Sequence, residues 1–453
     1  MALLKLALVF VLIVIALQRK ILVGHIFLCG SAVLFVLFTG YDLAAELEVI
    51  LSGKGETDTS ALSLLISYVY NLFSTITQSA LAPHALTLTT LVVLLLILSN
   101  SLQKCGNLQR ILACVRSNVK NHHLRITLFP ALIGLLPMPG GAIFSAPMVK
   151  ELASSECPPA QLSFFNYWFR HIWEYWWPLY PGILLLTSLS NTPIAVYSLT
   201  SFPLMIPAVL FGMLYLPKKR STLVVEKEER EEENVQYSGL LMLLKELTPI
   251  LIAIIPGFLL GGIFSFLFPN LVVSREIGLA LAIIAANCFV WFTTPHGISL
   301  IKEIIFNKHN FTMGYTAITI MIFKGVLDHS GAVQQIAGEL DAWHISLFLV
   351  CIILPFITGL ITGITIGFVG TSFPIIISLL QTTLPETQIL PYLILALVSG
   401  FIGTLISPLH LCLILSNEYF QAKLSDVYRY LLPPCLGMLG CGIAYFYILR
   451  YLL

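Results

Sequence analysis

The sequence predicts an all-α polytopic membrane protein with about ten transmembrane helices and two re-entrant hairpins, arranged as two inverted-topology repeats. Three observations predict this class. The chain is 57% hydrophobic and only 10% charged, with a mean hydropathy of +0.91. Apolar segments long enough to cross a bilayer recur along its whole length. Two other apolar segments are interrupted by proline and glycine in similar patterns.

The expected spans are apolar stretches with few charges: residues 2–18, 21–39, 84–99, 162–187, 195–216, 243–268, 276–294, 311–326, 391–416 and 430–451. Residues 40–60 are expected to form an acidic loop, and residues 61–82 an interfacial or peripheral helix rather than a span. Lysine and arginine gather in residues 101–126, which by the positive-inside rule places that segment in the cytoplasm.

The first interrupted segment, FPALIGLLPMPGGAIFSAPMVK, is apolar enough for lipid but rich in proline and glycine. Proline removes a backbone donor, and in lipid each freed backbone group costs several kcal/mol unless protein or a water-filled cavity receives it. We therefore expect a re-entrant hairpin at about 127–150. The segment LPFITGLITGITIGFVGTSFPIII predicts a second hairpin at about 346–377.

Matching positions suggest an internal repeat. Aligning Gly106 with Gly331, an offset of 225 residues, also sets Pro130 on Pro355, and Pro178 matches Pro408 at an offset of 230. The expected repeats are 1–217 and 241–453, joined by a charged cytoplasmic linker at 218–240. An odd number of spans separates equivalent points, so the halves should have opposite orientation, a pattern typical of secondary transporters.

The hairpin tips offer glycine-exposed backbone amides and the positive ends of half-helices, which suit a carboxylate or another anion. The alternative is that the glycines only allow close helix packing. The expected substrate-binding residues are Pro139, Gly140, Gly141 and Ser145 at the first tip, and Thr362, Gly363, Gly370, Thr371 and Ser372 at the second.

A second candidate cluster lies where prolines should interrupt two further helices, FRHIWEYWWPLYPG and GFIGTLISPLHLCL; its members are Arg170, His171, Glu174, Ser407 and His410. Arg170 could counter a substrate carboxylate, His171, Glu174 and His410 could carry protons, or unwound carbonyls with Glu174 could ligate Na⁺. The alternative is an interfacial Arg–Glu pair beside a tryptophan belt.

No catalytic residues, metal site or cofactor are expected, apart from Na⁺ as a coupling ion. The sequence has no HExxH motif and no nucleophile elbow in a strand context. Its nine cysteines form no CxxC and no metal-ligand spacing, so we expect them to be small apolar core residues. The net charge of +1 gives no basic field for nucleic acid.

The motifs PMPGGAIFSAP, HIWEYWWPLYP, TGITIGFVGTSFP and SPLHLCL resemble the ion transporter superfamily over about residues 84–217 and 311–450. That group includes gluconate permeases, dicarboxylate carriers and divalent-anion sodium symporters. The chain most resembles a poorly characterised integral-membrane permease family within it. The resemblance implies an elevator-type carrier, a homodimer, that holds substrate between hairpin tips and broken helices. The Ser-Asn-Thr tip signature of the divalent-anion symporters is absent, so neither a dicarboxylate nor sodium coupling follows.

These observations predict a secondary active transporter of a small organic anion, a carboxylate or sugar acid, coupled to H⁺ or Na⁺. It would be a multi-pass protein of the cell (inner) membrane in contact with membrane lipid, and it would not be an enzyme. The alternative is a membrane-embedded protein or enzyme that handles lipid or isoprenoid phosphates, for which only His171 and Glu174 could form an acid/base pair.

Overall fold

The computed structural model describes residues 1–18, 22–51, 61–119, 121–137, 141–152, 157–216 and 240–452. Throughout these ranges every regular element is a helix and no strand occurs. Eight helical segments are long and apolar enough to cross a membrane, or nine if one bent pair counts as a single span. The chain is therefore a multi-pass, all-helical membrane protein. Of the expected linker, residues 218–239 lie outside the described residues.

The eight candidate spans are Val23–Gly40, Pro83–Lys104, Ile194–Met213, Leu241–Leu267, Ser274–Thr293, Thr365–Thr383, Glu386–Phe420 and Leu424–Leu452. Within the described chain the prediction of ten spans was thus too high. The expected spans that are not among the eight are 2–18, 162–187 and 311–326. Residues 162–187 form two separate helices, α8 (Pro159–Trp168) and α9 (Pro181–Ser190), with a 3₁₀ turn and irregular backbone between them. Pro178 and Pro181 lie at the end of this interruption, where neither can donate a helical hydrogen bond.

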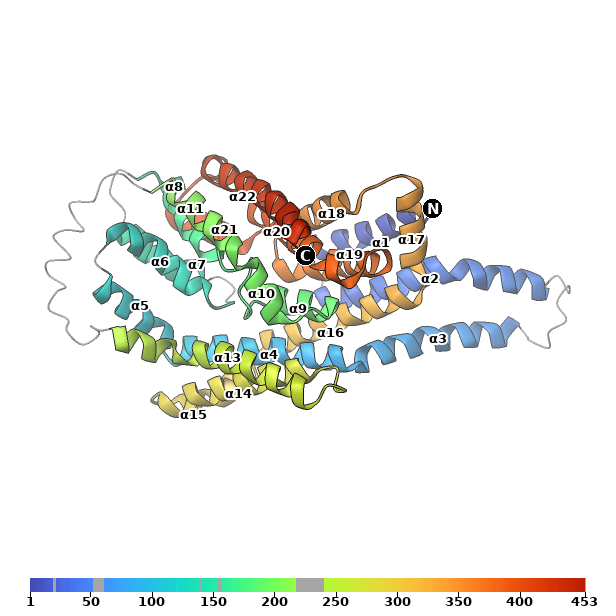
Figure 1. Ribbon diagram of the computed structural model, residues 1–453, viewed down its shortest axis with the longest axis horizontal. Coiled ribbons are helices and arrows are strands. Elements are labelled where there is room, and N and C mark those ends of the chain that lie inside the picture. The colour runs from blue at the N-terminus through green and yellow to red at the C-terminus, as the bar shows by residue number, and fades with distance from the viewer. Residues whose placement is uncertain are drawn as a thin grey trace.

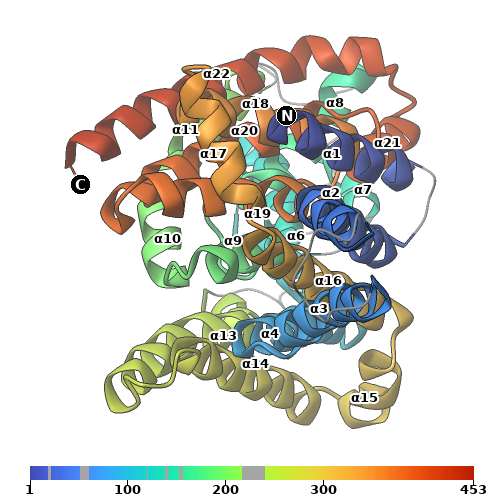
Figure 2. The ribbon, with the colours of Figure 1, turned by 90° about the vertical axis from the view of Figure 1, so that its right-hand side faces the viewer.

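One layer of the molecule consists of long helices that lie together at the bottom of Figure 2. These are α3 (Ala61–Leu81), α4 (Pro83–Lys104), α13 (Leu240–Leu267), α14 (Ser274–Thr293), α15 (Gly297–Ile305) and α16 (Lys308–His329). Helix α5 (Asn107–Asn118) joins this layer through an ion pair of 2.9 Å between Arg110 Nε and Glu246 Oε2. We call these helices, without α5, the lower layer.

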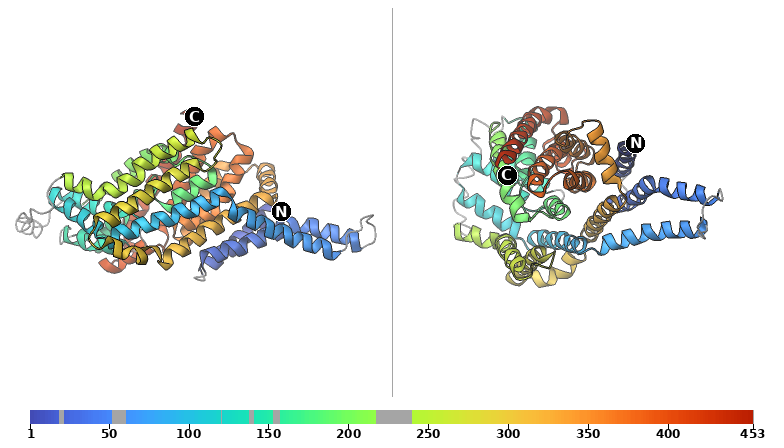
Figure 3. Two further views of the ribbon diagram at one scale, coloured as in Figure 1. Left: turned by 90° about the horizontal axis from the view of Figure 1, so that it is seen from below. Right: turned by 45° about the vertical axis from the view of Figure 1, so that its right-hand side comes forward.

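The remaining helices form the main body above the lower layer (Figures 1 and 2). They are α1 (Ala2–Gln18), α2 (Val23–Leu51), α6 (His122–Gly134), α7 (Ala142–Leu152), α8, α9, α10 (Ile194–Ser201), α11 (Met205–Met213), α17 (Ala332–Ala342), α18 (Leu347–Thr362), α19 (Thr365–Thr383), α20 (Ile389–Ile406), α21 (Leu411–Phe420) and α22 (Leu424–Leu452). Beyond the body, α2 projects beside α3 as a long pair (Figure 3, right). Tyr68 fixes this pair by packing on Phe35 and by its hydroxyl contact of 2.8 Å with Thr39 Oγ1.

Two predictions about the N-terminal third have different outcomes. Helix α2 continues to Leu51, so the acidic loop expected from residue 40 was wrong for residues 40–51. Glutamate is a good helix former, and the acidic side chains of this stretch are compatible with helix. The segment expected to be an interfacial or peripheral helix is the continuous helix α3, which is not among the eight candidate spans.

The helix pairs α6/α7 and α18/α19 occupy the two segments expected to form hairpins. Helices α18 and α19 are separated only by Gly363 and Ile364, and Gly363 has a left-handed φ of +62° that favours glycine. Helix α17 meets α18 at a bend of 117°. Whether either pair is re-entrant stays a prediction.

Some local features recur at the aligned positions, although an internal repeat stays a prediction. Gly106 and Gly331 both have left-handed backbone, with φ of +77° and +67°, and each precedes a short helix, α5 or α17. Further on, Asn191 and Gln421 both have φ of +55° and end the ten-residue helices α9 and α21. The inverted orientation of the two halves stays a prediction.

Helices α18 and α20 cross so closely that only glycine fits at the contact. A Cβ on Gly359 would overlap the carbonyl oxygen of Gly400, and a Cβ on Gly403 would overlap that of Phe356. Close approach of this kind lets helices pack through van der Waals contact, which is the main attraction available inside lipid.

Replacing Gly403 with alanine is therefore expected to lower the free energy of unfolding by about 1–3 kcal/mol, because the added methyl forces the two backbones apart. Gly440→Ala on α22 is the matched control, since a Cβ there meets nothing within 4 Å. Thermal unfolding of the detergent-purified variants measures both. Equal stability of the two variants would contradict the close crossing.

Candidate functional site

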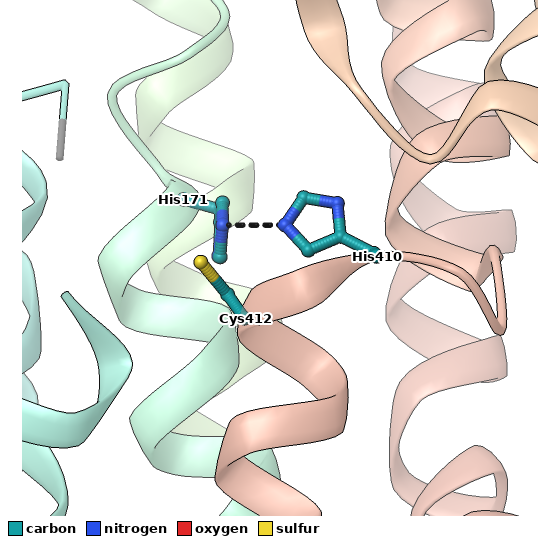
Figure 4. A group of neighbouring side chains, drawn as sticks. All are labelled: His171, His410 and Cys412. Carbon is teal, nitrogen blue, oxygen red and sulfur yellow. Dashed lines mark hydrogen bonds between the residues drawn. The ribbon is translucent and has the colours of Figure 1, made fainter. Parts of the chain in front are cut away.

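The candidate site lies where two interrupted helices meet. In the first, α8 ends at Trp168 and regular helix resumes only at Pro181. In the second, α20 ends at Ile406 and α21 begins at Leu411. We call residues 169–180 the first break and residues 407–410 the second break. The two breaks touch through His171 and His410, whose Nε2 atoms are 3.2 Å apart (Figure 4).

The first break lies against the first hairpin tip. A Cβ on Gly134 would overlap the carbonyl oxygen of Arg170, and a Cβ on Gly141 would overlap the guanidinium group of the same residue. The Tyr180 hydroxyl donates to the Gly134 carbonyl, and the Trp173 indole donates to the Ala131 carbonyl at 2.6 Å. Two backbone carbonyl groups in the last turn of α6 thus accept hydrogen bonds from side chains of the first break. Pro139 and Gly140 lie outside the described residues.

The second hairpin tip contacts both breaks. A Cβ on Gly363 would lie 3.0 Å from the backbone nitrogen of His410 and from Ser407 Oγ. Next along the tip, the Thr365 hydroxyl donates to Glu174 Oε2 in the first break. Thr362 ends α18 directly before this contact. The second tip therefore contacts both breaks. The two breaks also contact each other directly, through His171 and His410.

Four of the expected substrate-binding residues are not at this junction. Gly370, Thr371 and Ser372 lie inside α19, where the two hydroxyls donate to carbonyls of their own helix and Gly370 packs against Ile320 and Phe27. Ser145 lies inside α7 and donates to Asn166 Oδ1. Thr371 and Ser372 lie away from the second tip because that tip is formed at Gly363, eight or more residues before them.

The charged members of the cluster are deeply buried. Arg170 and His171 are each 3% exposed, and Glu174 and His410 are each 7% exposed. Glu174 Oε1 lies 3.8 Å from His171 Nε2. A buried charge needs partners that compensate its lost hydration. The alternative of an interfacial Arg–Glu pair depends on the membrane depth of these groups and stays a prediction.

Three residues at or beside the site were missed by the sequence reasoning. Thr365 follows the second tip, and Asn166 joins α7 to α21 by donating to the Ala142 carbonyl at 3.0 Å and to Ser416 Oγ at 2.9 Å. Cys412 is buried in the first turn of α21 and its sulfur points toward His171 (Figure 4). Its position two residues after His410 was the available signal. The expectation that all cysteines lie in the core was wrong for Cys29, which is exposed.

The Thr365–Glu174 hydrogen bond yields a stability prediction. Thr365→Val keeps the side-chain shape but removes the donor to a buried carboxylate, which we expect to lower the free energy of unfolding by ~1–3 kcal/mol. Thr383→Val on the same helix is the control, since its hydroxyl donates only to the Leu379 carbonyl. Chemical or thermal unfolding of both variants tests this, and an unchanged Thr365→Val protein would refute the assigned contact.

Comparison with known proteins places the chain in one family. No curated protein matches it. A family model described as a protein of unknown function, DUF401, matches residues 31–448, which include both hairpin tips and both breaks. The ion transporter superfamily is named by neither comparison, so that resemblance stays a prediction. Because the match covers nearly the whole chain, the protein belongs to the DUF401 family.

Proposed function

We propose that the protein is a secondary active transporter of a small organic anion, coupled to H⁺ or Na⁺ and working by alternating access. The observation that carries the proposal is the meeting of two helix breaks and two glycine-containing tips at one buried point. Broken helices that meet inside a membrane protein are the usual architecture of a substrate site in secondary transporters.

An anionic substrate is supported by the direction of the helices at this point. Helices α7, α9, α19 and α21 begin at Ala142, Pro181, Thr365 and Leu411, next to the tips or breaks. Helix N-termini carry partial positive charge and backbone N–H groups that bind anions. Arg170 adds a buried guanidinium, whose planar donors match a carboxylate. A carboxylate or sugar acid is the substrate class we infer.

The mechanism we propose is of the elevator type. The tips and breaks lie in the main body, whereas the lower layer consists of long helices packed below it (Figure 2). In this proposal the part of the main body that carries the site moves against the lower layer as scaffold. The features that recur at the aligned positions support two inverted repeats, as such carriers have. A homodimer in the cell (inner) membrane, with linker 218–240 in the cytoplasm, completes the proposal.

Coupling to protons is favoured over coupling to sodium. His171, His410 and Glu174 form a contiguous buried set, with the imidazoles in contact and the carboxylate 3.8 Å from His171. Protonation of Glu174 would remove the charge that accepts from Thr365 and so change the link between the second tip and the first break. Ionisable groups inside membrane proteins often serve as such proton relays.

The substrate proposal predicts anion-dependent stabilisation of the purified protein. A library of small carboxylates and sugar acids should contain at least one compound that raises the unfolding temperature, because binding to the native state stabilises it by mass action. Arg170→Gln should weaken that binding by ~100-fold, as expected for loss of a buried charge-assisted contact. Gly141→Ala should act in the same direction, because the new methyl displaces the guanidinium.

The matched control for Arg170→Gln is Arg450→Gln, which removes an arginine packed on the Tyr392 and Phe446 rings at the end of α22. It should bind the same anion with unchanged affinity. Stabilisation by lipid phosphates, with no response to any small anion, would refute the transporter proposal and favour a lipid-handling protein.

The coupling proposal predicts the behaviour of a histidine variant in proteoliposomes. His410→Gln keeps polarity but cannot take up a proton, so uptake of the anion should lose its dependence on a pH gradient while exchange persists. His329→Gln is the control, since its ring contacts only the Gly325 carbonyl at the end of α16. Uptake that follows a sodium gradient at constant pH in both proteins would overturn proton coupling.

A further inference from the structure

We propose that His171, His410 and Cys412 form a binding site for a zinc-class transition-metal ion at the contact between the two breaks (Figure 4). Imidazole nitrogen and cysteine thiolate are ligand types that Zn²⁺ prefers. The three potential ligand atoms lie within 4.8 Å of one another, and all three residues are buried. The proposal is separate from the proton coupling proposed above, because imidazoles that coordinate zinc cannot also carry protons, and ion binding is tested on the purified protein without transport.

The distances fit a tetrahedral ion. Zinc holds imidazole nitrogens at about 2.0–2.1 Å, so two such ligands at a tetrahedral angle lie about 3.3 Å apart. The two Nε2 atoms are 3.2 Å apart. A nitrogen and a sulfur ligand of the same ion lie about 3.6 Å apart, so closing the site requires a shift of about 1 Å at the widest pair. Side-chain rotation of Cys412 can supply such a shift.

The orientation of His171 is that of a metal ligand. Its Nδ1 lies 2.6 Å from the carbonyl oxygen of Tyr167, which can only accept, so Nδ1 carries the proton and Nε2 presents its lone pair toward His410. A backbone carbonyl that fixes the ring through the other nitrogen is the usual second partner of metal-binding histidines. This arrangement has a structural cause, since Tyr167 lies one helical turn before His171.

Charge and a fourth ligand are available nearby. Glu174 Oε1 is 3.8 Å from His171 Nε2, close enough to complete a tetrahedral set after a small movement. A Cys412 thiolate and a Glu174 carboxylate would together balance a divalent ion. The Arg170 guanidinium, which would repel a cation, lies against Gly141 at the first tip. The site would tie the two breaks together, although their residues are far apart in the chain.

The binding test uses full-length protein in detergent after treatment with a chelator. Co²⁺ is added as an optical probe, because thiolate coordination gives a charge-transfer band in the near ultraviolet and tetrahedral geometry gives intense visible bands. We expect one Co²⁺ per chain, displaced by one Zn²⁺. Cys412→Ser should abolish the thiolate band, and His410→Ala should weaken Zn²⁺ affinity by at least ~100-fold, as loss of a ligand requires.

Cys351→Ser is the matched control, since Cys351 is also buried but lies in α18 and is not part of the cluster. It should retain both the band and the affinity. Unfolding temperatures measured without metal establish that each variant is folded; if His410→Ala is not, His410→Gln replaces it. Absence of the thiolate band in folded wild-type protein, its persistence in Cys412→Ser, or binding of Cu⁺ but not Zn²⁺ would overturn the proposal.

Discussion

The structure depends on how backbone groups freed by broken helices are satisfied inside an apolar environment. Each break removes helical hydrogen bonds, and lipid offers no substitute, so the unpaired groups must face protein or water. The first break and the first tip meet this requirement together: Tyr180 donates to the carbonyl of Gly134, the last residue of α6, and Trp173 donates to the Ala131 carbonyl one turn before it. At the second break, Ser407 Oγ receives the Leu409 N–H at 3.2 Å. Bringing the breaks together concentrates this compensation in one place.

Burial of charge imposes a second constraint on the same place. Arg170 and Glu174 are both inside the protein, and an isolated ion there would be far more costly than a paired or hydrogen-bonded one. Glu174 receives the Thr365 hydroxyl at the start of α19, from the other half of the chain. The electrostatic environment of Glu174 is therefore set by groups from both halves of the chain.

Much of the fold could be predicted from composition and from proline and glycine positions, because these decide where a helix can continue. The pair α18/α19 lies in the expected segment, and the left-handed glycines at 106 and 331 match the sequence alignment. The expected span at 162–187 is not formed: the prolines mark the end of the interruption, but nothing in the residue pattern shows that the helix already ends at Trp168. Long-range partners were also out of reach: Cys412 joins His171 across more than 200 positions, and spacing within the sequence cannot show that contact.

Contacts between the halves bear on how the protein could move. The first tip contacts the first break through Gly141 and Arg170, and the second tip contacts the second break through Gly363 and His410. Two further contacts cross between the halves, Thr365 to Glu174 and His171 to His410. Opening the second tip alone would break its hydrogen bond to Glu174 in the other half of the chain and expose that buried carboxylate. In the proposed elevator mechanism, tips and breaks would move as one body and keep these contacts, while the packing of Gly370 in α19 on Ile320 in α16 would have to slide.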